Sequence, residues 1–109
     1  MALRDLLARG EMYPDWSDEE LRGEIPDPRL RREVLAELRP RPARFYEEPI
    51  PVFDGWPDAP CAYVQLSAAY DYSAAQARDR GWPCRRLRGT HFQMLVDPEG
   101  VAAAILDLI

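Results

Sequence analysis

Two short segments of this sequence hold residue types that could transfer a proton. Asp71 ends the segment 67–71, and His91, the only histidine of the chain, lies in the segment 89–92. Each segment follows residues that favour a β-strand, and the carboxyl ends of neighbouring parallel strands meet at one edge of a sheet. We therefore expect the Asp71 carboxylate and the His91 imidazole to lie within hydrogen-bonding reach.

An aspartate beside a histidine is the orienting half of a nucleophilic triad. The carboxylate fixes the tautomer of the imidazole, and the imidazole takes a proton from the nucleophile. The position of His91 after a strand, behind a glycine and ahead of a capped helix, favours this role over that of a structural histidine. For Asp71, a helix cap for residues 72–80 is an equally good interpretation, and Asp54 is a second candidate acid.

The nucleophile of such a site is the part that the sequence lacks. No G-x-S-x-G turn is present, and of the three serines, Ser17 and Ser73 fit the starts of helices. Ser67 lies at the end of a predicted strand, near the proposed pair, and is therefore the candidate nucleophile. No tight, strained turn surrounds it, so the sequence predicts only the acid–histidine half of a catalytic site.

The first half of the chain is predicted to be helical. Apolar residues recur at helical spacing in 2–9, Ser17 opens a second helix with a capping box, and Asp27-Pro28 opens a third that runs until Pro40. The segment 45–60 holds four prolines and is predicted to be an extended connector with aromatic anchors.

The second half is predicted to be a βαβα unit. Strands are expected over 61–67 and 84–89, with helices over 72–80 and from Asp97 to the end of the chain. The fold class is therefore α/β, with a helical segment at 1–48, a proline-rich connector at 49–60 and a βαβα unit at 61–109. Because two parallel strands alone leave open edges, we expect self-association or a partner chain to complete the sheet.

The C-terminal part resembles the end of alpha/beta-hydrolases. The stretch GTHFQMLVDPEGVAAAILDLI (89–109) is similar to their histidine loop and final helix, and 57–71 and 80–89 are similar to the acid loop with its strand and to the last strand. The resemblance implies the histidine role for His91, the acid role for Asp71 and a substrate rim built by the cap-like helices. The chain departs from the family in lacking the nucleophile turn and the oxyanion-hole segment.

Composition excludes several classes of function. The net charge of −5 argues against a nucleic-acid binder, and no run of apolar residues is long enough for a membrane span. The first residues do not follow the pattern of a secretory signal, so we expect a cytoplasmic protein. With one histidine and two cysteines, a four-ligand zinc site is not available without carboxylates, and we expect no cofactor. Cys61 and Cys84 are interpreted as buried thiols, and the sequence leaves open whether they form a disulfide.

Three functions fit these observations. In the first, the chain is a truncated hydrolase-like protein that needs a nucleophile from elsewhere for esterase or thioesterase activity. In the second, it is a non-catalytic, self-associating binding module. In the third, it is a small enzyme that uses His91 as a general base in a pocket formed by a dimer. A small apolar ester or acyl compound is the expected ligand. We expect Tyr70, Phe92 and Trp56 to contact it, and Tyr13, Trp16 and Tyr46 either to line a pocket or simply to pack helices. A fragment of a longer protein would have the same sequence features.

Overall fold

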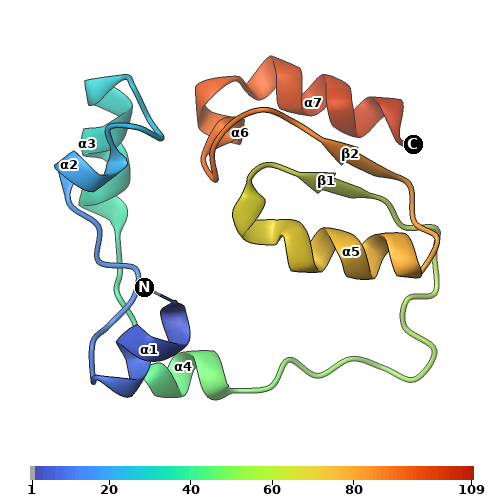
Figure 1. Ribbon diagram of the computed structural model, residues 1–109, viewed down its shortest axis with the longest axis horizontal. Helices are drawn as coiled ribbons and strands as arrows, with labels where there is room; N and C mark the ends of the chain where they lie inside the picture. The colour runs from blue at the N-terminus through green and yellow to red at the C-terminus, as the bar shows by residue number, and fades with distance from the viewer. Residues whose placement is uncertain (1) are drawn as a thin grey trace.

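The computed structural model describes residues 2–109, which form a mixed α/β structure in two parts (Figure 1). Four short helices, α1 to α4, make up the N-terminal part. A two-stranded parallel sheet with helices α5, α6 and α7 makes up the C-terminal part. A long connector runs between the two parts at the bottom of the view, and the chain brings them together again at the top. The predicted fold class is confirmed at this level.

The N-terminal helices begin and end where local sequence signals place them. Their bounds are Leu3–Ala8 for α1, Asp18–Leu21 for α2, Pro28–Glu37 for α3 and Ala43–Glu47 for α4. Gly10, with a positive φ of 79°, follows α1 and allows the chain to turn away. The hydroxyl of Ser17 accepts from the backbone N–H of Glu20, and the Glu20 carboxylate accepts from the Ser17 N–H, which is the predicted capping box. The Asp27 side chain caps α3.

Arg31 ties α2 to α3. Its Nε donates to the Asp18 carboxylate at 2.9 Å, and its Nη1 donates to the carbonyl oxygens of Ile25 and Pro26, both at 2.9 Å. Only 12% of the Arg31 side chain is exposed. The hydrogen bond from Arg31, followed by that from Arg22, lowers the pKa of Asp18 below its ordinary value of 3.8. The turn between the two helices is thus held by one guanidinium.

This pair predicts an acid-sensitive contribution to stability. Because the pKa of Asp18 is lower in the folded chain, its contribution is fully present above the ordinary carboxyl pKa and is lost as the pH falls from that value through the lowered pKa of the folded chain. Urea unfolding from about pH 7 to pH 3 should show a stability gap between the wild type and Asp18→Asn that narrows once the pH falls below 3.8. Asp15→Asn removes a carboxylate that has no hydrogen-bond or ion-pair partner within residues 2–109, and it should show no such gap. Equal behaviour of the two variants would contradict the prediction.

The C-terminal part follows the predicted order strand, helix, strand, helix. Strand β1 (Tyr63–Gln65) leads through a 3-10 turn, η1 (Ala68–Tyr70), into α5 (Asp71–Asp79), and then come β2 (Cys84–Arg86), α6 (Gln93–Val96) and α7 (Pro98–Asp107). The strands are parallel, with Val64 opposite Arg85. Helix α5 packs against both strands on one side of the sheet, and α7 lies on the other side in Figure 1. Gly81, with a φ of 76°, ends α5 as predicted.

Several details differ from the sequence predictions. Each strand has three residues, against seven and six predicted, and in β1 only Gln65 is buried, so the strand is not enclosed on both faces. The short helices α4 and α6 were not predicted. Helix α4 begins directly after Pro42, which is its N-cap residue and has an extended backbone. Both cysteines are free and half-buried rather than buried.

The connector contributes little to the core. The predicted aromatic anchors are largely exposed: 54% for Phe45, 57% for Phe53 and 50% for Trp56. Ile50 and Val52 are also exposed. Extended backbone with prolines buries little surface, and no neighbouring element covers this segment within residues 2–109.

Each part has a small core of its own. The buried apolar residues among those described are Leu21 and Ile25 in the helical part and Ala74, Ala77 and Ala104 in the C-terminal part. These are few and mostly small side chains, so each single large contact matters for stability. No helix in residues 2–109 is long and apolar enough to cross a membrane.

Candidate functional site

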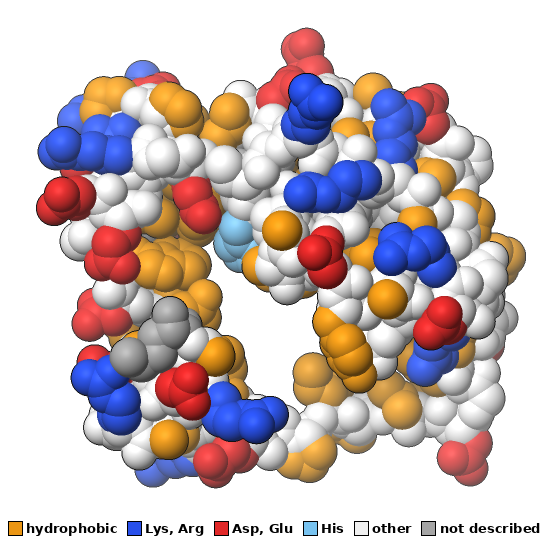
Figure 2. All heavy atoms as spheres, viewed as in Figure 1, with side chains coloured by type: hydrophobic (Ala, Val, Ile, Leu, Met, Phe, Trp, Pro, Cys, Tyr) orange, Lys and Arg blue, Asp and Glu red, His pale blue; other side chains and the backbone are white. Residues whose placement is uncertain are grey.

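A cavity of about 300 Å3 lies where the helical part meets the C-terminal part. Figure 2 shows the molecule hollowed between the two parts, with the histidine side chain at the edge of the hollow. The residues that line the cavity are Tyr13, Trp16, Glu20, Leu21 and Glu24 from the helical part and Ser67, Ala69, Tyr70 and His91 from the C-terminal part. This volume is at the lower end of the range for small-molecule sites.

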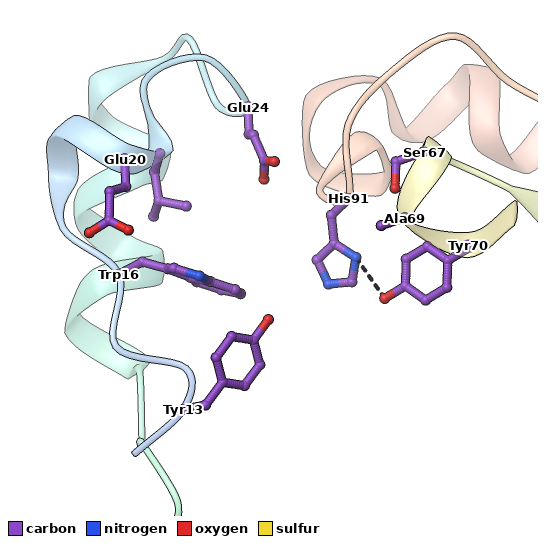
Figure 3. Close-up of a pocket in the computed structure, with 9 residues that line it drawn as sticks. Tyr13, Trp16, Glu20, Glu24, Ser67, Ala69, Tyr70 and His91 are labelled. Atoms are coloured by element: carbon purple, nitrogen blue, oxygen red, sulfur yellow. Dashed lines mark hydrogen bonds between the residues drawn. The ribbon is translucent and has the colours of Figure 1, made fainter. Parts of the chain in front are cut away.

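His91 stands on the C-terminal wall with its two ring nitrogens in different surroundings (Figure 3). Nδ1 lies 3.0 Å from the Tyr70 hydroxyl, and the two rings are nearly parallel, at 13°, with centroids 5.5 Å apart. Nε2 has no hydrogen-bond partner in the described part of the chain, and in Figure 3 it faces the opposite wall with Trp16 and Tyr13. One nitrogen is thus held by the protein, and the other is open to a ligand.

The tyrosine partner sets what this histidine can do. A carboxylate only accepts hydrogen bonds, so it fixes the tautomer that leaves Nε2 as a base. The Tyr70 hydroxyl can either accept from Nδ1–H or donate to a bare Nδ1. His91 can therefore present Nε2 to the cavity as a proton acceptor or as a proton donor, and Tyr70 fixes the ring orientation without fixing the tautomer.

Asp71 is not the residue that contacts His91. It begins α5, its side chain is exposed, and its Oδ1 accepts a hydrogen bond from Gln65 Nε2 at 2.6 Å. The same amide donates to the Ser67 carbonyl oxygen at 2.9 Å. Asp71 also does not cap a helix, because α5 already includes it and its carboxylate makes no capping bond. The predicted sheet edge is the right one, but the neighbouring residue Tyr70 takes the place beside the imidazole.

Ser67 lies on the same wall. Its Oγ is fully buried and, within the described residues, is the one buried side-chain oxygen or nitrogen without a hydrogen-bond partner. A buried hydroxyl without a partner costs about 1–3 kcal/mol. The residue also lines the cavity beside His91, so a ligand oxygen is a possible partner for this hydroxyl.

Trp16 forms the contact between the two walls. Its ring packs edge-on against Phe92 at 5.3 Å and lies 6.5 Å from the His91 ring. Next to it, the Thr90 hydroxyl donates to the carbonyl oxygen of Glu24 at 3.0 Å. The loop that carries His91 is thereby fixed to the helical part by a ring contact and a hydrogen bond.

Tyr13 is held in the helical wall by backbone bonds. Its N–H donates to the Arg41 carbonyl at 3.0 Å, its own carbonyl accepts from the Arg41 N–H at 2.8 Å, and the Tyr46 hydroxyl also donates to that carbonyl. Burial raises the pKa of the Tyr13 hydroxyl, and Tyr70, Tyr46 and Glu24 raise it further. The hydroxyl therefore stays protonated and can donate to a ligand.

The three predicted substrate contacts lie in different places. Tyr70 lines the cavity, Phe92 packs against Trp16 and His91, and Trp56 is half exposed in the connector and does not line the cavity. Three further aromatic residues were expected either to line a pocket or to pack helices, and two of them, Tyr13 and Trp16, line the cavity. Tyr46 lines a separate groove between α1 and α4.

Sequence reasoning did not find Gln65, Thr90 and Glu24, which fix or face the site. The role of Gln65 could have been predicted from the sequence, because a polar residue inside an apolar strand needs a hydrogen-bond partner nearby. The roles of Thr90 and Glu24 could not, because their contact joins residues 66 positions apart.

Comparison with protein-family models, with curated proteins and with solved structures found no match. The resemblance to alpha/beta-hydrolases therefore stays a prediction. Residues 2–109 contain no group of three or more side chains placed to hold a metal ion.

Proposed function

We propose that this chain binds a small ester or acyl compound in the cavity between its two parts and hydrolyses it with His91 as the general base. The observation that carries the proposal is the placement of His91, with Nδ1 held by Tyr70 and Nε2 open to the cavity. The site combines residues of both parts of one chain, so it does not need a pocket formed by a dimer.

The reaction uses water as the nucleophile. Nε2 takes a proton from a water molecule as its oxygen attacks the acyl carbon, and the resulting imidazolium returns the proton to the leaving oxygen. The products are a carboxylic acid and an alcohol. The Tyr70 hydroxyl can accept from Nδ1–H while Nε2 acts as the base, and it can keep accepting from Nδ1–H of the imidazolium until Nε2 returns its proton.

Ser67 Oγ has no hydrogen-bond partner in the described residues, so no base is placed to take its proton, and this favours water over serine as the attacking group. In this proposal the Ser67 hydroxyl donates a hydrogen bond to the carbonyl oxygen of the bound compound. Such a bond would remove the cost of leaving the hydroxyl without a partner.

The test is hydrolysis of activated short-chain esters by the purified chain and by Ser67→Ala. We expect slow turnover by the wild type, no covalent acyl adduct in mass spectra, and a rate lowered by about tenfold in the variant, because one hydrogen bond to the reacting oxygen is lost. The unliganded variant should be as stable as the wild type or slightly more stable. An acyl adduct on Ser67 would show that serine is the nucleophile, and a wild type without any turnover would overturn the proposal.

The expected self-association, or completion of the sheet by a partner, stays a prediction. The largely exposed apolar connector and the two-stranded sheet support it. The split-enzyme hypothesis is less favoured, because a water nucleophile makes a second chain unnecessary.

A further inference from the structure

The wall of the cavity opposite His91 has a chemical character that the proposed hydrolysis does not use. It is built by two aromatic rings and a carboxylate. The Tyr13 and Trp16 rings lie 5.6 Å apart at 87°, so they form a corner. The Glu24 carboxylate lies on the same wall, above Trp16 in the view, and points into the space facing His91 (Figure 3).

Glu24 is half-buried, and its carboxylate has no hydrogen-bond or ion-pair partner in residues 2–109. Its backbone carbonyl, by contrast, is bonded to Thr90, so the residue is fixed in place. Glu20 also lines the cavity, but its carboxylate is engaged in the capping box of α2. Glu24 is thus the free anion of this site.

No positively charged side chain balances this carboxylate. Among the described residues, no arginine lines the cavity. A hollow of about 740 Å3 adjoins the cavity and shares Tyr13, Trp16 and Glu20 with it, and no described arginine lines that hollow either. The adjoining hollow adds the carboxylate of Asp15 and that of Glu11, which is paired with Arg9 at 3.8 Å. Burial is the main cause of the raised pKa of Tyr13, and the Glu24 carboxylate adds a smaller share.

We infer that the ligand of this cavity carries a positively charged amine, held by Glu24 and the rings of Tyr13 and Trp16. Aromatic rings attract ammonium groups through their negative faces, and a carboxylate that is partly shielded from water attracts them more strongly than an exposed one does. This inference rests on the proposed function, since it places the charged end of the compound on the helical wall and its acyl group near His91.

The probes are choline and its neutral carbon isostere, which have nearly the same shape and differ in charge. Binding can be followed through the imidazole proton signals of His91, because the chain has a single histidine. We expect choline to bind about tenfold more tightly than the isostere. In Glu24→Gln this preference should fall by about fivefold or more, while binding of the isostere stays unchanged and shows that the variant is folded.

Glu19→Gln is the matched control. It makes the same charge change nearby, in helix α2 rather than in the turn that follows this helix and carries Glu24, and Glu19 does not line the cavity. Equal affinity for choline and the isostere, or equal loss of choline affinity in both variants, would overturn the inference. If neutral esters are still hydrolysed in a His91-dependent manner, only the amine preference fails. If there is neither binding nor hydrolysis, the proposed function fails as well.

Discussion

The variant His91→Gln should hydrolyse activated esters about a hundredfold more slowly than the wild type, at the lower end of what general-base catalysis contributes. Glutamine is similar in size to histidine and can still accept from or donate to the Tyr70 hydroxyl, but it cannot take a proton from water. The loss should appear in kcat, while KM changes little, because the cavity keeps its shape.

Tyr70→Phe is the control that separates orientation from proton transfer. The phenyl ring can keep the near-parallel contact with His91, while the hydrogen bond of 3.0 Å to Nδ1 is lost. Because a hydroxyl does not fix the tautomer, we expect a loss of only about three- to tenfold, which is the value of one ordinary hydrogen bond. A rate that is unchanged in His91→Gln would show that any hydrolysis arises elsewhere on the chain.

Trp16→Ala should lower the free energy of unfolding by about 2–3 kcal/mol, a large part of the stability of a chain with so small a core. The Trp16 ring contacts Tyr13 within the helical part and Phe92 and His91 of the C-terminal part, and the last two contacts join the two parts of the molecule. Urea unfolding would measure the loss. The His91 proton signals should move toward their unfolded positions at lower urea concentrations than in the wild type.

Trp56→Ala is the matched control for this change. It removes the same side chain from the connector, where Trp56 is 50% exposed and stacks on no other ring in residues 2–109. We expect a change of less than about 0.5 kcal/mol. If the two variants were equally destabilised, Trp16 would not be the residue that joins the two parts.

Local signals in the sequence were sufficient to predict most of the helices. The capping box at Ser17, the aspartate–proline starts at Asp27 and Asp97, and the glycine that ends α5 act through neighbours within a few residues. The strands were overestimated because apolar, β-prone residues extend beyond the three that actually pair. Pairing depends on the partner strand, which a local pattern does not specify.

The order of the strands predicted the edge of the sheet at which the candidate site lies, but not the side-chain contacts within the site. The two parallel strands bring the loops of Ser67 and His91 to one edge of the sheet, as their order in the chain implies. Whether Tyr70 or Asp71 faces the imidazole depends on the direction in which a helix begins, and one residue of difference changes the partner. The wall with Trp16 and Glu24 depends on contacts between distant parts of the chain, for which the sequence has no local signal.

The exposed connector links the helical part and the C-terminal part, which form the two walls of the cavity, and so acts as a tether between them. The tether keeps each wall at a high effective concentration for the other, so a few contacts suffice to hold them together. A compound that touches both walls adds its binding free energy to those contacts. The melting temperature of the chain therefore becomes a measure of its ligand, and each tenfold rise in ligand concentration above the dissociation constant adds about 1.4 kcal/mol to the stability of the closed form.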